Sequence, residues 1–116
     1  MRSSIAALAV MLAVAGHANA QGGRDHHQDA MSVVMIGGGV GGGRVIGATD
    51  SIGAYVTDPG WSAQRPIVME DIASTIYSAL GIDWTKSLLN TPSGRKFEYV
   101  PSASRGLYKP IDEVFR

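Results

Sequence analysis

The stretch GGRDHHQDAMSVVMIGGGVGGG, residues 22–43, joins a polar lead-in with two adjacent histidines to a short apolar run and a glycine-rich turn. The apolar run, residues 31–36, is rich in β-branched side chains and bounded by glycine, which predicts a buried strand. Six of the next seven residues are glycine. Three readings compete: a nucleotide-binding loop, a metal site, or one part of a site whose other residues lie elsewhere.

The first twenty residues have the three-part pattern of a secretory signal peptide. Arg2 gives a positive start, residues 5–15 are all apolar, and Ala18-Asn19-Ala20 is the small-x-small pattern that signal peptidase cleaves. The apolar run is shorter than the roughly 20 residues that a membrane-spanning helix needs. We therefore predict a leader helix over residues 1–20, removed to give a periplasmic or secreted chain without a membrane span. The alternative is a buried N-terminal helix.

The chain predicted to remain, residues 21–116, is small and nearly neutral. It carries nine basic and ten acidic residues, a formal net charge of −1, and has no basic stripe, so we expect no nucleic-acid partner. It has no cysteine to form the disulfides that small exported domains often use. It also contains fourteen glycines, whose ordering costs entropy. These properties suit part of a larger domain better than a complete one.

The glycine-rich turn meets only half of the requirements of a dinucleotide site. Gly37, Gly39 and Gly42 satisfy G-x-G-x-x-G after a predicted strand. The motif must also open a helix whose N-terminus holds the pyrophosphate, but residues 44–56 contain two more glycines and no helical apolar spacing. No Gly-Lys-Ser/Thr follows, so a P-loop fails too. We expect no cofactor here, and either a turn between two strands or a place where another backbone packs closely.

Four residues of the polar lead-in have side chains that bind metal ions: Asp25, His26, His27 and Asp29. Zinc sites need three or four protein ligands around one point. Neighbouring side chains of an extended segment point to opposite sides, so the two histidines are not expected to share an ion. The remaining possibilities are one or two ligands of a site completed elsewhere, or a solvated lead-in without a role.

The clearest regular element is a helix over about residues 69–80. Its apolar residues recur at helical spacing and form one face: Ile72, Ile76, Ala79 and Leu80. Acidic residues occupy its first turn, where the helix dipole favours negative charge, and Gly81 is placed to end it. Weaker patterns predict short strands over residues 44–46 and 97–100 and a terminal helix or tail over 111–115. Residues 47–61 have the composition of a loop.

The order of these motifs resembles a known family. Residues 22–55 resemble the C-terminal part of the bacterial family called domain of unknown function 1501, in which a Gly-Arg-Asp-His stretch precedes an apolar strand, a glycine-rich turn and a Val-Ile-Gly-x-Thr-Asp segment. MEDIASTIYSALGID, residues 69–83, is similar to the helix that follows in that family, and PIDEVF, residues 110–115, to its closing segment. Where relatives begin this helix with Thr-Pro, this chain has Val68-Met69.

That family resembles the alkaline phosphatase and sulfatase superfamily, which implies a mixed α/β sandwich with a metal-assisted site for phosphate or sulfate esters. In such enzymes a late histidine, just before a C-terminal core strand, binds a metal ion. His26 occupies the comparable place, while Arg24 and Asp25 match the same motif and are expected to position it at most. The superfamily's nucleophile and other metal ligands lie upstream of this motif.

The resemblance therefore predicts an α/β chain, a partial mixed α/β sandwich with a few short strands and one main helix. Residues 21–116 are expected to be a truncated C-terminal fragment of a secreted sulfatase-like or phosphatase-like hydrolase, inactive alone. No catalytic or cofactor-binding residue is assigned in it, and a divalent metal is implied only through the family. Its partner would be the upstream part of its own domain.

The alternative is a small exported binding or interaction module. It would contact its ligand through the glycine-rich turn and four aromatic residues: Tyr55, Trp61, Tyr77 and Trp84. This hypothesis predicts a closed, cooperative fold with a concave apolar patch.

Overall fold

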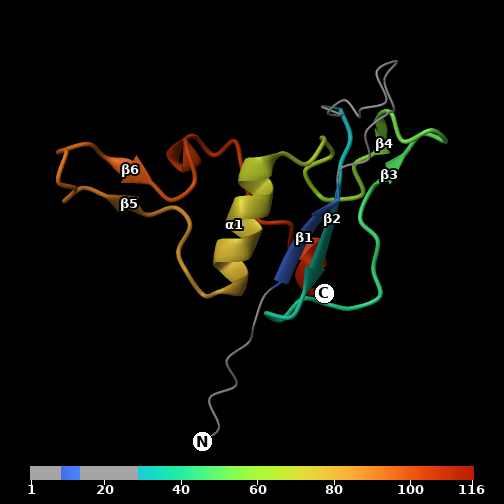
Figure 1. Cartoon of the computed structure of the whole chain (residues 1–116), viewed down its shortest axis with the longest axis horizontal. Helices are drawn as coiled ribbons and strands as arrows, with labels where there is room; N and C mark the ends of the chain where they lie inside the picture. Colours follow the sequence, from blue (N-terminus) through green and yellow to red (C-terminus); the bar gives the residue numbers. More distant parts are fainter. Residues whose placement is uncertain (1–8, 14–28) are drawn as a thin grey trace, which may run out of the picture.

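The computed structural model describes residues 9–13 and 29–116 (Figure 1). Within these ranges one α-helix, α1 (Met69–Ala79), is accompanied by three antiparallel two-stranded pairs. The strands are β1 (Ala9–Ala13) with β2 (Ser32–Ile36), β3 (Ala48–Thr49) with β4 (Val56–Asp58), and β5 (Ser87–Leu88) with β6 (Phe97–Glu98). Two 3₁₀ helices follow, Ala103–Arg105 and Asp112–Phe115. In Figure 1, α1 is drawn between the β1–β2 pair and the β5–β6 hairpin. The described part is thus a small mixed set of strands around one helix, as an α/β fragment predicts.

The two strongest predicted elements are confirmed. The strand expected over residues 31–36 is β2, and the helix expected over 69–80 is α1, each within one residue at either end. The two weaker predictions near the C-terminus are confirmed in part. The strand β6 covers the first half of residues 97–100, and the second 3₁₀ helix covers most of 111–115.

The predicted strand over residues 44–46 and the predicted loop over 47–61 are wrong. Residues 44–46 are irregular, and the supposed loop contains β3 and β4. The side chain of Asp50 closes this hairpin, because its Oδ1 accepts a hydrogen bond from the backbone N–H of Ala54 at 2.6 Å. The backbone N–H of Asp50 donates to the carbonyl of Tyr55 at 3.0 Å. A turn held by one aspartate does not need the alternating apolar pattern by which strands are recognised.

The leader helix predicted over residues 1–20 lies mostly outside the described residues. Its described portion, Ala9–Ala13, is the strand β1. It pairs antiparallel with β2 in a continuous register from Ala9↔Ile36 to Ala13↔Ser32. The signal-peptide prediction for residues 1–20 stays a prediction.

The apolar core is small and centres on three buried residues, Trp61, Ile72 and Ile111. Partly buried side chains pack around it: Val33, Met35, Ile46, Ala63, Ile67, Ile76 and Val114. They come from β2, the residues just before β3, the segment before α1, α1 itself and the C-terminal segment. One face of β2 is thereby held against α1 and the end of the chain.

The two ends of α1 are closed in different ways. Val68 precedes the helix and has no side chain able to cap it, but Asp71 Oδ2 accepts the backbone N–H of Val68 at 3.0 Å. At the other end Gly81 adopts φ +71° and donates its N–H to the carbonyl of Ser78 at 3.0 Å. The N–H of Ile82 reaches the carbonyl of Tyr77 at 2.8 Å, completing a Schellman motif. The predicted stop at Gly81 is confirmed.

The buried face of α1 is rotated from the one that apolar spacing predicts. Ile72 is buried and Ile76 is half-buried against the core, as expected, but Leu80 is 50% exposed. The fully buried positions beside Ile72 are polar: Asp71, Ser74 and Thr75. The helix turns this polar strip inward because several hydrogen bonds meet there, as described below.

The glycine-rich turn is a tight connection and also a place of close backbone packing. Gly37, Gly38 and Gly39 have positive φ, and the N–H of Val40 donates to the carbonyl of Gly37 at 2.9 Å. A side chain on Gly41 would run into the backbone carbonyl of Arg116. No helix follows until α1 begins, so the G-x-G-x-x-G match lacks the helix N-terminus that a pyrophosphate needs.

Candidate functional site

An apolar hollow of about 1080 Å³ lies beside β2. The whole of β2 lines it, together with residues 40–49 on the side of the glycine-rich turn. Four residues of the core and its surroundings also line it: Ile67, Ile72, Ile111 and Val114. Ligand pockets commonly measure about 300–1,000 Å³, so this hollow is large enough to take a small molecule or further protein elements.

The two faces of β2 are apolar but differ in what covers them. Val33 and Met35 are half-buried against the core, whereas Val34 and Ile36 are 45% and 64% exposed. Strands with apolar residues on both faces are typical of α/β sheets covered on both sides. The described part of the chain covers one of these faces.

Over residues 9–13 and 29–116, one backbone edge of β2 is not used for pairing. Among the described residues β1 is its only partner, and the resulting sheet has two strands. A strand with partners on both sides is the usual arrangement inside a sheet, since an open edge leaves N–H and C=O groups unpaired. β2 therefore has both an open backbone edge and exposed apolar side chains, and it also lines the hollow.

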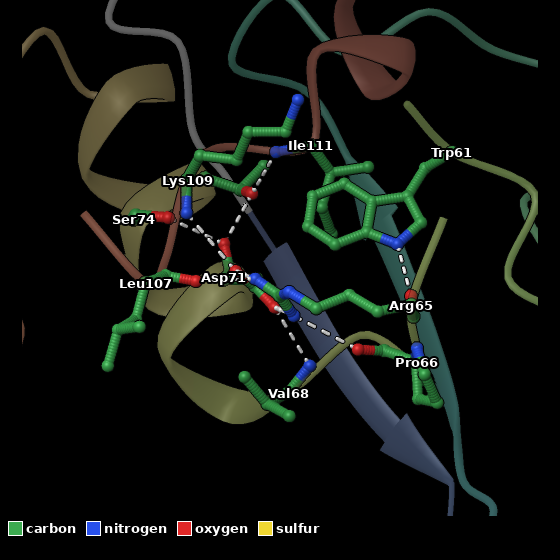
Figure 2. A network of polar contacts seen from close by, with 10 residues as sticks. Trp61, Arg65, Pro66, Val68, Asp71, Ser74, Leu107, Lys109 and Ile111 are labelled. Carbon is green, nitrogen blue, oxygen red and sulfur yellow. Dashed lines mark hydrogen bonds and ion pairs between the residues drawn. The ribbon is translucent and has the colours of Figure 1, made fainter. Parts of the chain in front are cut away.

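A buried carboxylate anchors the helix behind this hollow. Asp71 is fully buried and receives two hydrogen bonds from the guanidinium of Arg65, at 2.6 and 2.7 Å. The backbone N–H groups of Val68 and Lys109 also donate to it, at 3.0 and 3.1 Å. Figure 2 shows these groups converging on Asp71. One side chain thus ties α1 to the segment before it and to the C-terminal segment.

The second layer of this network runs through the backbone of α1. The carbonyl of Asp71 accepts hydrogen bonds from the hydroxyls of Ser74 and Thr75, at 2.9 and 2.6 Å. Thr75 Oγ1 in turn accepts the backbone N–H of Ile111 at 2.9 Å. These bonds satisfy polar groups that would be costly to bury unpaired, and they place Ile111 in the core next to Ile72.

The charge state of this network follows from its contacts. Burial by itself would raise the pKa of Asp71, but the hydrogen bonds from Arg65 and the two backbone N–H groups outweigh it, so its pKa lies below the ordinary value. The hydrogen bond to Asp71 raises the pKa of Arg65. At neutral pH the pair is an ionised, bidentate salt bridge, which has the geometry of a structural anchor.

The indole ring of Trp61 packs against the two cationic side chains of the same network. Its ring lies 5.0 Å from the guanidinium carbon of Arg65 and 5.5 Å from Nζ of Lys109. Its Nε1–H donates to the carbonyl of Arg65 at 2.6 Å, and Lys109 Nζ donates to Ser62 Oγ at 2.6 Å. The charged groups of Arg65 and Lys109 are therefore both in contact with other groups of the protein. Their arrangement holds the loop before α1 in place.

The residues predicted from the sequence to bind metal lie outside the described part of the chain. This applies to His26 and to Asp25 and His27 beside it, and also to Arg24, which was expected only to position His26. Asp29, the first residue described after them, lines the hollow. Over residues 9–13 and 29–116, no group of three or more His, Cys, Asp or Glu side chains is placed to hold a metal ion. The assignment of His26 stays a prediction.

The aromatic residues of the alternative hypothesis do not share one surface. Trp61 is 2% exposed in the core, and Tyr77 stacks on Tyr99 with ring centroids 5.5 Å apart. Tyr55 is exposed near the β3–β4 hairpin. The hollow beside β2 is lined mainly by aliphatic residues and glycines of β2 and the following turn, and none of the four aromatic residues lines it.

The Asp71 network was missed at the level of sequence. Asp71 was interpreted only as a negative charge at a helix N-terminus. Its partners Arg65 and Lys109 are six and 38 residues away, and neither spacing is a recognised motif. The available signal was an acidic residue at the third helical position behind a residue that cannot cap the helix, a place where a carboxylate reaches back to the backbone.

Comparison with known proteins identifies the family. The model of the family described as "Protein of unknown function (DUF1501)" matches residues 13–109, most of the chain. The chain belongs to the DUF1501 family. The match includes β2, the glycine-rich turn, α1, and Asp71 with its partners Arg65 and Lys109, and it ends at Lys109, before the PIDEVF segment. No curated protein and no solved structure matches the chain.

In this DUF1501 chain, the structure describes no helix that is long and apolar enough to cross a membrane.

Proposed function

We propose that this chain is one part of a metal-dependent phosphate- or sulfate-ester hydrolase of the DUF1501 family, and that it is inactive without the rest of that domain. The observation that carries the proposal is that β2 is only partly covered by the described chain. This strand is apolar on both faces, has one unpaired edge in the described part of the chain, and borders a hollow of about 1080 Å³. A further section of the α/β domain would occupy the hollow and cover Val34 and Ile36.

The proposed contribution to chemistry is one metal ligand and the wall beside it. His26 lies six residues before the start of β2, at the place where related hydrolases carry a late metal-binding histidine. A bound divalent ion would polarise the ester oxygen. Zinc-type sites need at least three protein ligands, and the described residues gather no such set. The nucleophile and the remaining ligands are therefore assigned to the other section.

The Asp71 network has a supporting role in this proposal. It fixes α1 and the C-terminal segment behind one face of β2, so that β2 is presented as a rigid strand. Precise positioning matters for hydrolysis, since a displacement of about 1 Å at a reacting group can cost roughly 100-fold in rate. The chain thus supplies a rigid base for His26, and its partner section supplies the opposing half.

The test is reconstitution. The chain is co-expressed with the section of another DUF1501 protein that precedes the Gly-Arg-Asp-His motif, and the complex is assayed with p-nitrophenyl phosphate and p-nitrophenyl sulfate in zinc, magnesium, manganese or calcium. We expect turnover from the complex and none from either section alone. His26→Ala should abolish turnover, while the matched control His27→Ala should retain most of it.

Three outcomes would contradict the proposal. Turnover by this chain alone, lost in His26→Ala, would make it a complete enzyme. A stable complex with no turnover of either ester under any of the metals would remove the hydrolase assignment. Cooperative unfolding of the chain alone, together with saturable binding of a small apolar ligand in the hollow, would favour the binding-module alternative.

A further inference from the structure

The edge of β2 that β1 occupies behaves as a site for an extended strand. All five residues of β2 are paired, from Ser32↔Ala13 to Ile36↔Ala9. An exposed strand edge offers a row of N–H and C=O groups, which is a ready template for another strand. The strand that fills it here has the sequence Ala-Val-Met-Leu-Ala, which carries no charge, proline or glycine. Such a composition suits addition to the edge of an apolar strand.

The connection between the two strands is unusually long for a hairpin. Residues 14–28, fifteen in number, separate the end of β1 from the described segment that begins at Asp29. Hairpin strands are commonly joined by about two to five residues, which fix the register through the turn. Here the register is set by the pairing itself, so β1 resembles a tethered ligand more than one arm of a tight hairpin. A tethered strand can be displaced by a competitor of similar sequence.

We propose that this edge of β2 is a peptide-binding site for an extended, uncharged, apolar strand that enters antiparallel to β2. Ala9–Ala13 fills this site within the chain and keeps it closed to other strands. Displacement of Ala9–Ala13, or its removal with the leader predicted over residues 1–20, opens the site to a strand of another polypeptide. The proposal concerns the paired edge of β2 and does not depend on the hydrolase assignment, which uses the opposite, unpaired edge.

The first experiment tests the register in the full chain. The chain has no cysteine, so an engineered pair gives the only possible disulfide. Met11 and Val34 are Cα partners, and opposed residues of an antiparallel pair are close enough for a disulfide. Met11→Cys with Val34→Cys should form an intramolecular disulfide under mild oxidation. The matched control, Leu12→Cys with Val34→Cys, places the two thiols on opposite faces and should form little.

The second experiment tests exchange of the strand. Proline cannot donate to a strand ladder, so Met11→Pro in the full chain should release β1, whereas Met11→Ala should not. Hydrogen exchange of the β2 amides should be faster in Met11→Pro by at least about tenfold. A synthetic peptide of residues 7–15 should restore slow exchange in Met11→Pro and leave Met11→Ala unchanged. The same peptide with Met11 replaced by aspartate serves as the charged-strand control and should restore less.

Tryptophan fluorescence of a Trp84→Phe background, which leaves the buried Trp61 as the only tryptophan, reports whether the core of each variant is intact. Equal cross-linking of both cysteine pairs, or of neither, would overturn the pairing of β1 with β2. Unchanged exchange in Met11→Pro with an intact core would overturn its role as the occupant. Faster exchange that saturating peptide fails to reverse would overturn the edge as a peptide-binding site.

Discussion

At the scale of single residues, the carboxylate of Asp71 connects three parts of the chain through its hydrogen bonds. It accepts the backbone N–H of Val68 at the start of α1, pairs with Arg65, and accepts a hydrogen bond from the backbone of Lys109. Because it is fully buried, removing its charge leaves donors without their acceptor. The stability of the described core should therefore depend on this carboxylate more than on any surface ion pair.

The first prediction concerns that carboxylate. Asp71→Asn should lower the free energy of unfolding of the full chain by about 3 kcal/mol at pH 7, the lower end for a broken buried pair. The lower end applies because the side chain of Arg65 keeps 34% exposure and can be solvated. The matched control is Asp83→Asn, an exposed aspartate that caps a local turn. Its effect on the unfolding free energy should be much smaller, because exposed side chains contribute little to stability.

The same pair predicts a pH dependence. The pKa of Asp71 is lower in the folded chain than its ordinary value of about 4. Its contribution to stability is therefore fully present above that ordinary value and is lost as pH falls through the folded pKa. The difference in unfolding free energy between the native chain and Asp71→Asn should shrink below about pH 4. A difference that stays constant from pH 7 to pH 2 in denaturant titrations would contradict the ionised salt bridge.

The second prediction concerns two glycines with similar backbone angles and different surroundings. Gly60 and Gly53 have φ of +66° and +70°, so any side chain is strained at both. A Cβ on Gly60 would collide with the backbone of Gly47, whereas a Cβ on Gly53 meets nothing within 4 Å. Gly53→Ala should cost about 1 kcal/mol from backbone strain alone. Gly60→Ala should exceed it by about 1–3 kcal/mol, measured as the difference in unfolding free energy. Equal costs would mean that the contact between Gly60 and Gly47 is absent.

At the scale of elements, the sequence was most informative where the physical cause was local. β2 and α1 were predictable because a β-branched apolar run and an amphipathic run ending in glycine are sufficient to define them. The β3–β4 hairpin was not predictable, since it depends on the side chain of Asp50 bonding to the backbone four residues later. The buried face of α1 was only half predictable. The polar partners that draw Asp71 and Thr75 inward come from residues 65 and 109–111, and no local pattern contains them.

The third prediction tests which face of α1 is buried. Ile72 is 7% exposed in the core cluster, while Leu80 is 50% exposed at the end of the helix. Ile72→Ala should cost about 2–5 kcal/mol of unfolding free energy, because it removes a buried side chain. Leu80→Ala, the matched control on the face that apolar spacing predicted, should cost less than about 1 kcal/mol. If chemical denaturation showed a larger loss for Leu80→Ala than for Ile72→Ala, the buried face of α1 would be the one that apolar spacing predicts.

At the scale of the whole molecule, the described chain has more apolar surface than its small core can cover. Beyond Trp61, Ile72 and Ile111, large apolar side chains of β2 and of the following turn stay exposed, including Val34, Ile36 and Val45. Family membership and motif order were readable from the sequence, whereas the candidate site was readable only in outline. Composition gave no sign that β2 would border a hollow, because a hollow depends on which elements are absent around a strand.

The last prediction concerns the fate of the segment that forms β1. Residues 5–15 and the Ala18-Asn19-Ala20 site predict recognition by the export machinery and cleavage. The same segment supplies Ala9–Ala13 to the edge of β2. A strand paired within a folded chain is not free to enter an export channel, so the two fates compete, and export should precede folding.

N-terminal sequencing of the exported protein should begin at Gln21. Val34→Pro weakens the same pairing from the β2 side and leaves residues 1–20 unchanged, so it should leave cleavage as efficient or raise it. Replacing Ala18 and Ala20 with arginine removes the cleavage site and serves as the control, since that variant should keep its leader. An intracellular product that retains Met1, with the native sequence and with Val34→Pro alike, would show that residues 1–20 are a permanent part of the protein.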